Sequence, residues 1–350
     1  MEPVTHFLTG ACLARAGLNR KAAYATVAMT LAAEAPDLDT LWSIDGPIAA
    51  FQHHRGWTHT FLGIPFEAAI VVGAIWLFHR WRTRRSNPGK SPHAPVRWGL
   101  LYCLCLIALL SHLLLDWTNN YGLRPFFPFN PRWYSGSFVF IVEPVLLLIL
   151  LVALIAPSLF GLINTEVGVR KQAFRGRGWA IAALLAMTAL WTVRFFQHQK
   201  ALRLAQNAEY NGAPVLRVAA DPYPINPFHW QTVTETPQSY QISTANTFNN
   251  TIATGSQAET IYKPPTTLAT LVAKRSWLGE VYLDWSQYPV VMETGIDPDG
   301  LTTVSFRDLR FLEDTVLYRA RGDAPPLSGT VYVNSDRRIV RMEFNGHVQD

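Results

Sequence analysis

Residues 98–117 read WGLLYCLCLIALLSHLLLDW, a run of twenty residues in which Asp116 is the one Asp, Glu, Lys or Arg. Crossing the hydrocarbon core of a bilayer, roughly 30 Å thick, takes about 20 helical residues. The run therefore predicts a membrane-spanning helix. His112 and Asp116 are four residues apart near its end, so the helix would carry both on one face.

Three further stretches are long and apolar enough to span a membrane, at about 60–78, 137–157 and 178–196. Two shorter apolar stretches, about 4–16 and 21–33, come before them. At roughly 13 residues each they cover only about 20 Å as helices, which favours a short helical hairpin over two full spans. We expect an α-helical membrane bundle of four long spans plus this N-terminal hairpin.

Composition and charge agree with a membrane protein. The 350 residues are 49% hydrophobic and 16% charged, more apolar than a single soluble core requires. The net charge of +5 arises from Lys and Arg that lie between the apolar stretches of residues 1–200, the pattern of a topology signal. Nucleic acid is therefore not an expected partner. Cys12, Cys103 and Cys105 all lie in apolar stretches, so we expect no disulfide framework in the polar half.

The basic connections predict an orientation for the spans. Residues 79–97 and 158–177 are rich in Lys and Arg, as is the hairpin tip around Arg20. By the positive-inside rule these segments face the cytoplasm. The opposite ends of the spans, and everything after about residue 197, would then face the extracytoplasmic side of a bacterial inner membrane.

The pattern changes from about residue 215, where short alternating or β-branched stretches are broken by Pro, Gly, Asn and Asp. These stretches are YQISTANTF (240–248), GEVYLDW (279–285), YPVVMET (288–294), LTTVSF (301–306), TVLYRA (315–320), GTVYV (329–333) and RIVRMEF (338–344). Asn334–Asp336, between the last two, predicts a hairpin turn. We expect a membrane domain at 1–200, a helical connector at 201–214 and a mostly-β extramembrane domain at 215–350.

Histidines and aspartates gather at the ends of the predicted segments. His6 opens the hairpin, and Pro36, which stops its second arm, lies next to Asp37 and Asp39. Residues 53–59, just before the first long span, read HHRGWTH. The orientation derived from Lys and Arg alone brings these segments to the same side of the membrane as the His–Asp pair of the opening run.

Each of these pieces also has a structural interpretation. The first histidine could be interfacial, the two aspartates could form a helix-stop turn, and the His–Asp pair could be an ion-paired helix terminus. Of the adjacent His53 and His54, we expect one to be functional and the other a bystander. Acids and imidazoles are costly to bury unpaired near a membrane, so their convergence favours a functional site.

Imidazole and carboxylate groups are ligands for zinc, iron and manganese, and the site has no cysteine ligand for a closed thiolate zinc centre. We therefore expect a divalent transition metal as cofactor, with zinc as the first candidate and manganese or iron as alternatives. The number of candidate ligands is compatible with one ion or two.

The motifs together resemble the predicted membrane-bound metal-dependent hydrolases of bacteria, of the LexA-regulated, membrane-interacting type, in a long form with a C-terminal β-rich extension. The matching pieces are Thr5-His6, PDLD (36–39), HRGWTH (54–59), His112-x-x-x-Asp116, TNNYG (118–122) and Pro125–Pro128. They follow the family's order over about residues 1–157. The resemblance implies a metal-dependent hydrolase whose motif positions fall on His6, Asp37, His54, His59, His112 and Asp116. Thr60 and Glu143 stand where many relatives have Ser and Asp, and neither change removes a ligand type.

Roles for the remaining polar groups follow from hydrolysis chemistry. A metal with an open coordination position lowers the pKa of a bound water, and Asp39 or Glu34 could take its proton as general base. Arg55 and Arg124 could hold a phosphate, because guanidinium pairs bidentately with its oxygens. For Arg55, a salt bridge to one of the nearby acids is an equal alternative.

Two functions follow from the sequence. One is a hydrolase that cleaves an ester or phosphoester of a lipid-linked or interfacial substrate, with membrane lipid as its surroundings. The other is a non-catalytic membrane scaffold or sensor with a structural metal site and a β domain that binds a partner. The sequence gives no oligomeric state.

Overall fold

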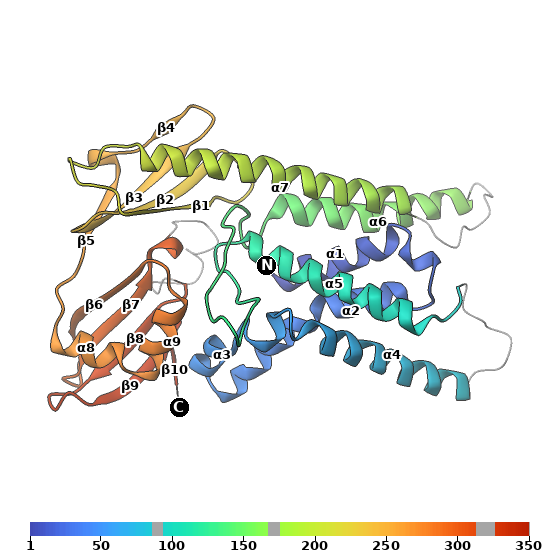
Figure 1. Cartoon of the computed structure of the whole chain (residues 1–350), viewed down its shortest axis with the longest axis horizontal. Coiled ribbons are helices and arrows are strands. Elements are labelled where there is room, and N and C mark those ends of the chain that lie inside the picture. Colours follow the sequence, from blue (N-terminus) through green and yellow to red (C-terminus); the bar gives the residue numbers. More distant parts are fainter. Residues whose placement is uncertain (86–93, 167–175, 313–325, 350) are drawn as a thin grey trace. The chain divides into compact units, whose positions relative to one another are not determined.

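The computed structural model describes residues 1–85, 94–166, 176–312 and 326–349 (Figure 1). The chain forms two compact units, each described here by itself. Unit 1 comprises Met1–Asp39 and Arg55–Phe195, and unit 2 comprises Thr40–His54 and Phe196–Asp350. The domain limits expected at residues 200 and 215 stay a prediction.

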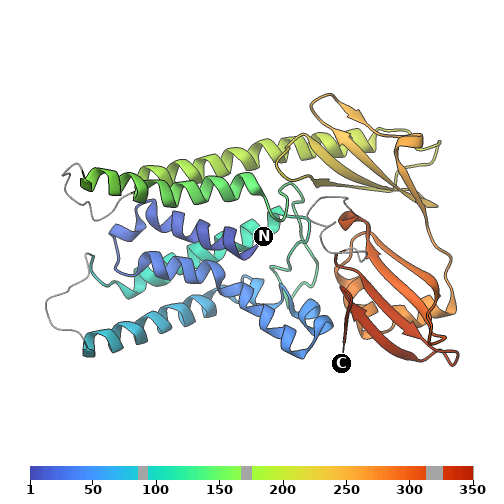
Figure 2. The ribbon, with the colours of Figure 1, turned by 180° about the vertical axis from the view of Figure 1, so that it is seen from behind.

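Unit 1 is a helical bundle. Its helices are α1 (Pro3–Arg15), α2 (Ala25–Glu34), α4 (Ile64–Arg85), α5 (Trp98–Thr118), α6 (Pro144–Glu166) and α7 (Arg177–Gln206), of which the last turns belong to unit 2. The 3₁₀ segments are η1 (Leu18–Arg20), η2 (Ala35–Asp45), which runs on into unit 2, and η3 (Trp57–His59). Helix α5 packs against α1, α2 and α4, while α6 packs against α1 (Figures 1 and 2).

Three helices of the described chain, α4, α5 and α7, are long and apolar enough to cross a membrane. The apolar part of α6 that is described is shorter, Pro144–Phe160, so the expected fourth long span is not confirmed. The prediction also placed the start of this helix too early, at residue 137. Proline is favoured in the first turn of a helix, and here Pro144 occupies its first position.

The hairpin of α1 and α2 is closely packed because of Gly10. A Cβ atom at this position would lie 2.7 Å from Met29 O and 2.8 Å from Ala33 Cβ, closer than real Cβ contacts allow. Helix α1 therefore approaches the end of α2 along its backbone. This contact holds His6, one turn before Gly10, beside the segment that carries Asp37.

The buried face of α5 continues into its polar end. Leu101, Cys105, Ala108 and His112 are all buried, at the spacing of one helical face. Asp116 follows on the same face and is fully buried. The packing that fixes the apolar part of α5 thus also fixes the direction of its two polar side chains.

Unit 2 contains two antiparallel five-stranded sheets. The first is ordered β1 (Arg217–Pro222), β2 (His229–Glu235), β3 (Ser239–Asn246) and β4 (Thr251–Ile252), with β5 (Glu259–Tyr262) paired to β3. The second is ordered β10 (His347–Val348), β9 (Ile339–Phe344), β8 (Gly329–Val333), β7 (Thr302–Asp308) and β6 (Pro289–Ile296). Unit 2 also contains α3 (Pro47–His53), α8 (Leu268–Lys274), α9 (Trp277–Trp285), η4 (Gly255–Gln257) and η5 (Leu309–Phe311).

The mostly-β character of the C-terminal part is confirmed, and one strand prediction within it was wrong. Residues 279–285 lie in helix α9, not in a strand. Ser276 caps this helix by accepting a hydrogen bond from Gly279 N, and Leu278, Tyr282 and Trp285 are buried at helical spacing. The predicted turn at Asn334–Asp336 is confirmed, because β8 and β9 pair antiparallel across it. The predicted strand at 315–320 lies outside the described residues.

Candidate metal centre

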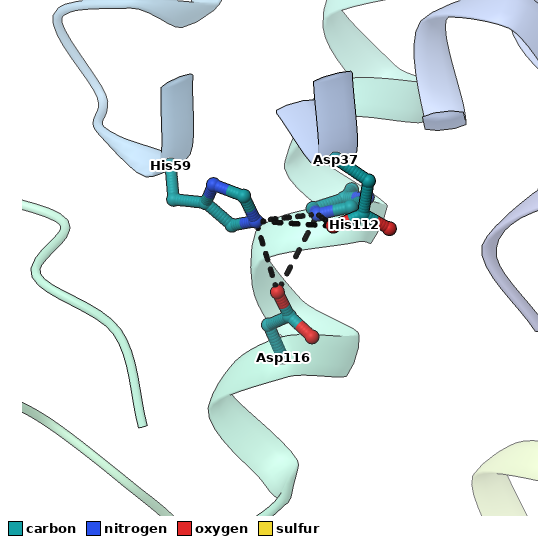
Figure 3. Close-up of side chains that lie close together, drawn as sticks. All are labelled: Asp37, His59, His112 and Asp116. Atoms are coloured by element: carbon teal, nitrogen blue, oxygen red, sulfur yellow. Dashed lines mark hydrogen bonds and ion pairs between the residues drawn. The ribbon is translucent and has the colours of Figure 1, made fainter. Parts of the chain in front are cut away.

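Four side chains from three separate segments of unit 1 converge on one point: Asp37, His59, His112 and Asp116 (Figure 3). One donor atom from each lies within 4.8 Å of the other three. His59 Nε2 is 3.0 Å from His112 Nε2, 3.5 Å from Asp37 Oδ1 and 3.3 Å from Asp116 Oδ2. His112 Nε2 is 3.7 Å from Asp37 Oδ1 and 3.4 Å from Asp116 Oδ2.

His112 is oriented by the backbone of α2. Its Nδ1 lies 2.7 Å from the carbonyl oxygen of Ala33, which can only accept a hydrogen bond. In the neutral ring, Nδ1 therefore carries the proton and the lone pair of Nε2 faces the cluster. Metal-binding histidines are commonly fixed in this way by a hydrogen bond from the other ring nitrogen.

His59 is oriented from its other side. Its Nδ1 lies 3.0 Å from Thr58 Oγ1 and 3.4 Å from Asp39 Oδ2. Burial by itself would lower the pKa of His59, but hydrogen bonds with Asp116 and Asp37 raise it to about 9. Burial would likewise raise the pKa of Asp37, yet the hydrogen bond with His59 holds it below its usual range. Without a metal, the cluster thus favours a proton on His59.

Arg55 holds Asp116 and the loop after α5. Its Nη2 donates to Asp116 Oδ1 at 2.8 Å and its Nη1 to Gly122 O at 2.7 Å and Asn119 Oδ1 at 3.4 Å. The guanidinium carbon also lies 4.7 Å from the ring centroid of Tyr121. Arg55 is buried and paired, so of its two predicted roles the salt bridge is the one that the structure displays.

The backbone of Arg55 adopts the left-handed region with φ of 55°, which costs a non-glycine residue about 1 kcal/mol or more. In this conformation Arg55 N donates to Asp39 Oδ2 at 2.7 Å. Asp39 thereby links the turn at Arg55 to the ring of His59. This placement makes Asp39 a support for His59.

His6 lies beside the cluster. Its ring stacks on that of His112 with centroids 3.7 Å apart, and its Nε2 is 3.4 Å from Asp116 Oδ1. The α-amino nitrogen of Met1 contacts the same oxygen. His6 is not one of the four residues that could share a single ion, so its role as a ligand stays a prediction.

Glu34 and His54 are not among the four donors. Glu34, at the end of α2, is half-buried, and burial together with the like charge of Asp37 raises its pKa to about 7. His54 is counted in unit 2 and is not in the group that could hold an ion. Its neighbour His53 stacks on Trp42, with centroids 4.1 Å apart.

Sequence reasoning assigned no part in the site to the carbonyl oxygens of Ala33 and Gly122 or to the side chains of Asn119 and Tyr121. A backbone carbonyl leaves no mark in a sequence. The motif at 118–122 did contain three of these residues, so its position directly after Asp116 was the available signal.

The donor set fits a divalent transition metal. Four ligands roughly 2.0–2.1 Å from a tetrahedral ion lie about 3.3–3.4 Å from one another. Here the two imidazole nitrogens lie 3.0 Å apart, and the distances from them to the carboxylate oxygens are 3.3–3.7 Å. Two nitrogens and two oxygens suit zinc, iron or manganese alike, so the cluster could bind a metal ion whose identity it does not select.

A curated relative, the uncharacterized protein YfhP of Bacillus subtilis (strain 168), is 26% identical over 152 residues, which cover 41% of this chain and 42% of that protein. The chain thus matches less than half the length of this relative. No solved structure matches.

A sequence model described as YdjM inner membrane protein matches residues 1–201. These residues include all four members of the cluster. Because this match covers more than half of the 350 residues, the chain belongs to the YdjM inner membrane protein family.

Proposed function

We propose that this protein is a membrane-bound metal-dependent hydrolase that cleaves an ester or phosphoester of a lipid-linked or interfacial substrate. The observation that carries the proposal is the convergence of Asp37, His59, His112 and Asp116 in unit 1. Two imidazoles and two carboxylates whose donor atoms lie this close together are a ligand set suited to a hydrolytic metal site.

These four residues would hold the ion through His Nε2 atoms and carboxylate oxygens. A divalent transition metal bound there, zinc being the first candidate, supplies Lewis-acid chemistry and activates a water molecule as nucleophile. Asp39 and Arg55 position His59 and Asp116 through the contacts described above. Glu34, whose pKa burial and the like charge of Asp37 raise to about 7, would take the proton of that water as general base near neutral pH.

The proposed substrate follows from the position of the cluster along the spans. His59 lies just before the start of α4, and Asp116 lies in the last turn of α5. Arg82, Arg84 and Arg85 lie in the last turn of α4, at its other end. By the positive-inside rule we assign those arginines to the cytoplasm and the metal centre to the extracytoplasmic face, where lipid-linked substrates are accessible.

Burial of the centre favours a second candidate function, a membrane scaffold with a structural metal. The side chains of His59, His112 and Asp116 are 0% exposed and that of Asp37 is 12% exposed. Catalytic metal sites keep one coordination position open for water, and structural sites are closed. A metal that only joins η2, η3 and α5 would need no such opening.

Metal analysis and hydrolysis assays on the same preparation separate these functions. The full chain is purified in detergent, its metal content is measured, and cleavage of phospholipids and model phosphoesters is compared with and without chelator. We expect stoichiometric transition metal and hydrolysis that chelation abolishes. The double variant His59→Ala/His112→Ala should lose both.

A matched double variant, His53→Ala/His229→Ala, removes two histidines outside the cluster and should keep metal and activity. If the cluster variant keeps normal hydrolysis, or if the wild type contains no metal, the hydrolase proposal fails. If metal is present but no ester is cleaved, and the cluster variant only unfolds at lower temperature, the scaffold function holds instead.

A further inference from the structure

His6 is a fully buried imidazole whose Nδ1 lacks a hydrogen-bond partner and whose Nε2 lies 3.4 Å from Asp116 Oδ1. Leaving a buried donor or acceptor unpaired costs about 1–3 kcal/mol, and buried polar groups are therefore nearly always satisfied. The two neighbouring histidines differ in this respect, because His112 Nδ1 contacts Ala33 O and His59 Nδ1 contacts Thr58 Oγ1. The ring of His6 is thus less firmly paired than the rings of its two neighbours.

The contacts of Asp116 indicate where a further partner of His6 would lie. Its Oδ2 faces His59 Nε2 and His112 Nε2 at 3.3 and 3.4 Å, whereas its Oδ1 faces His6 Nε2 at 3.4 Å. The two oxygens of one carboxylate thus point toward two different sets of imidazoles. A carboxylate in this arrangement can bridge two cations, which in two-metal sites lie roughly 3.5–4 Å apart.

Oδ1 of Asp116 has capacity for a cation in addition to its present contacts. It accepts a hydrogen bond from Arg55 Nη2 at 2.8 Å and contacts the α-amino nitrogen of Met1. A carboxylate offers about four lone-pair sites over its two oxygens. A cation between Oδ1 and His6 would share that oxygen with Arg55 and displace the amino group.

We propose that unit 1 binds two divalent ions bridged by Asp116, the first held by Asp37, His59 and His112 and the second by His6. This pair rests on the metal centre of the proposed function and is independent of whether an ester is cleaved. It extends that centre by one ion and by His6, which the four-residue cluster leaves out.

The number of ions and the coupling between them test the pair directly. The full chain in detergent is stripped with chelator and reloaded with Mn²⁺ alone, and bound Mn²⁺ per chain and the electron paramagnetic resonance spectrum are recorded. We expect two ions per chain and the spectrum of an exchange-coupled pair. His6→Ala should bind one ion per chain with the spectrum of isolated Mn²⁺, and the control His53→Ala should keep the coupled pair.

A wild type that binds a single Mn²⁺, or two without exchange coupling, overturns the pair, and this result needs no variant to fold. A folded His6→Ala that still shows a coupled pair overturns the assignment of His6. Hydrolysis is measured on the same samples. Two coupled ions without hydrolysis would contradict the proposed function and support the pair of ions. Hydrolysis with one bound ion would support the proposed function and contradict the pair.

Discussion

Two buried aspartates, Asp116 in unit 1 and Asp308 in unit 2, differ in the groups that surround their carboxylate oxygens. Asp308 Oδ1 accepts from Arg310 N and Nε, both at 3.0 Å. Its Oδ2 accepts from Arg310 Nη2 at 2.9 Å, Ser286 Oγ at 2.6 Å and Gln287 N at 2.9 Å. Asp116 Oδ2, in contrast, faces two imidazole nitrogens, His59 Nε2 at 3.3 Å and His112 Nε2 at 3.4 Å.

A buried carboxylate can support the fold or bind a ligand, and its partners distinguish the two roles. A carboxylate whose lone pairs accept from protein donors needs no further partner, and its removal leaves those donors unpaired. A carboxylate that faces two imidazole nitrogens is placed to share a cation with them. We therefore expect Asp308 to support stability and Asp116 to bind metal, and four predictions test that division.

The largest expected effect is on stability, from Asp308→Ala. The change leaves the buried guanidinium of Arg310 without its carboxylate, and breaking a buried ion pair in this way costs about 3–5 kcal/mol. Hydrogen exchange of the β7 amides in the full chain should report this loss of opening free energy. Metal content per chain should stay at the wild-type value. Loss of metal would contradict the separate roles of Asp308 and Asp116.

Asp116→Asn should have the next largest effect, and this effect should be on metal affinity. Asparagine keeps the shape of the side chain but removes the charge that binds the ion. Changing a residue that only supports a ligand costs about 10–100-fold in metal affinity, so loss of the ligand itself should exceed about 100-fold. Titration against a chromophoric chelator measures the affinity, and protection of β7 should not change. Unchanged affinity would contradict the assignment.

Arg55→Lys should weaken metal binding by about 10–100-fold, the range for a residue that orients a ligand. Lysine keeps the charge but cannot contact Asp116 and Gly122 at once, because it lacks the planar fork of arginine. The same chelator titration gives the affinity. Arg132→Lys, at an exposed arginine that contacts the ring of Tyr134, is the matched control and should bind metal as the wild type does.

The smallest expected effect is on the stability of the fold at acidic pH. Asp308 is buried, which by itself would raise its pKa, but the positive charge of Arg310 lowers it below the ordinary value. A carboxyl with a lowered folded-state pKa stabilises the fold above its unfolded pKa, and this contribution is lost as pH falls through the folded value. Protection of β7 in the wild type should approach that of Asp308→Asn as pH falls below about 4. A constant difference between the two proteins would refute this role.

The sequence predicted the membrane helices of unit 1 better than the helices of unit 2. Residues 98–117 were placed within one residue of α5 because a long apolar run has few alternatives in water. Residues 279–285 were misassigned because a seven-residue stretch with two aromatics and one valine suits a strand by composition. The cap at Ser276 and the burial of Tyr282 against Phe51 and Phe306 decide for a helix.

The same contrast holds within the site. The sequence alone determined the donor types, their places at segment ends and the shared face of His112 and Asp116, because residue chemistry and helical spacing are local properties. Only the tertiary structure decided that Asp37 and His59 join that pair, that His6 approaches the other oxygen of Asp116, and that Arg55 supports it from a left-handed turn. These outcomes depend on distances between segments that are far apart in the chain. Packing contacts such as that of Gly10 against Met29 and Ala33 set those distances, and no local sequence pattern encodes such contacts.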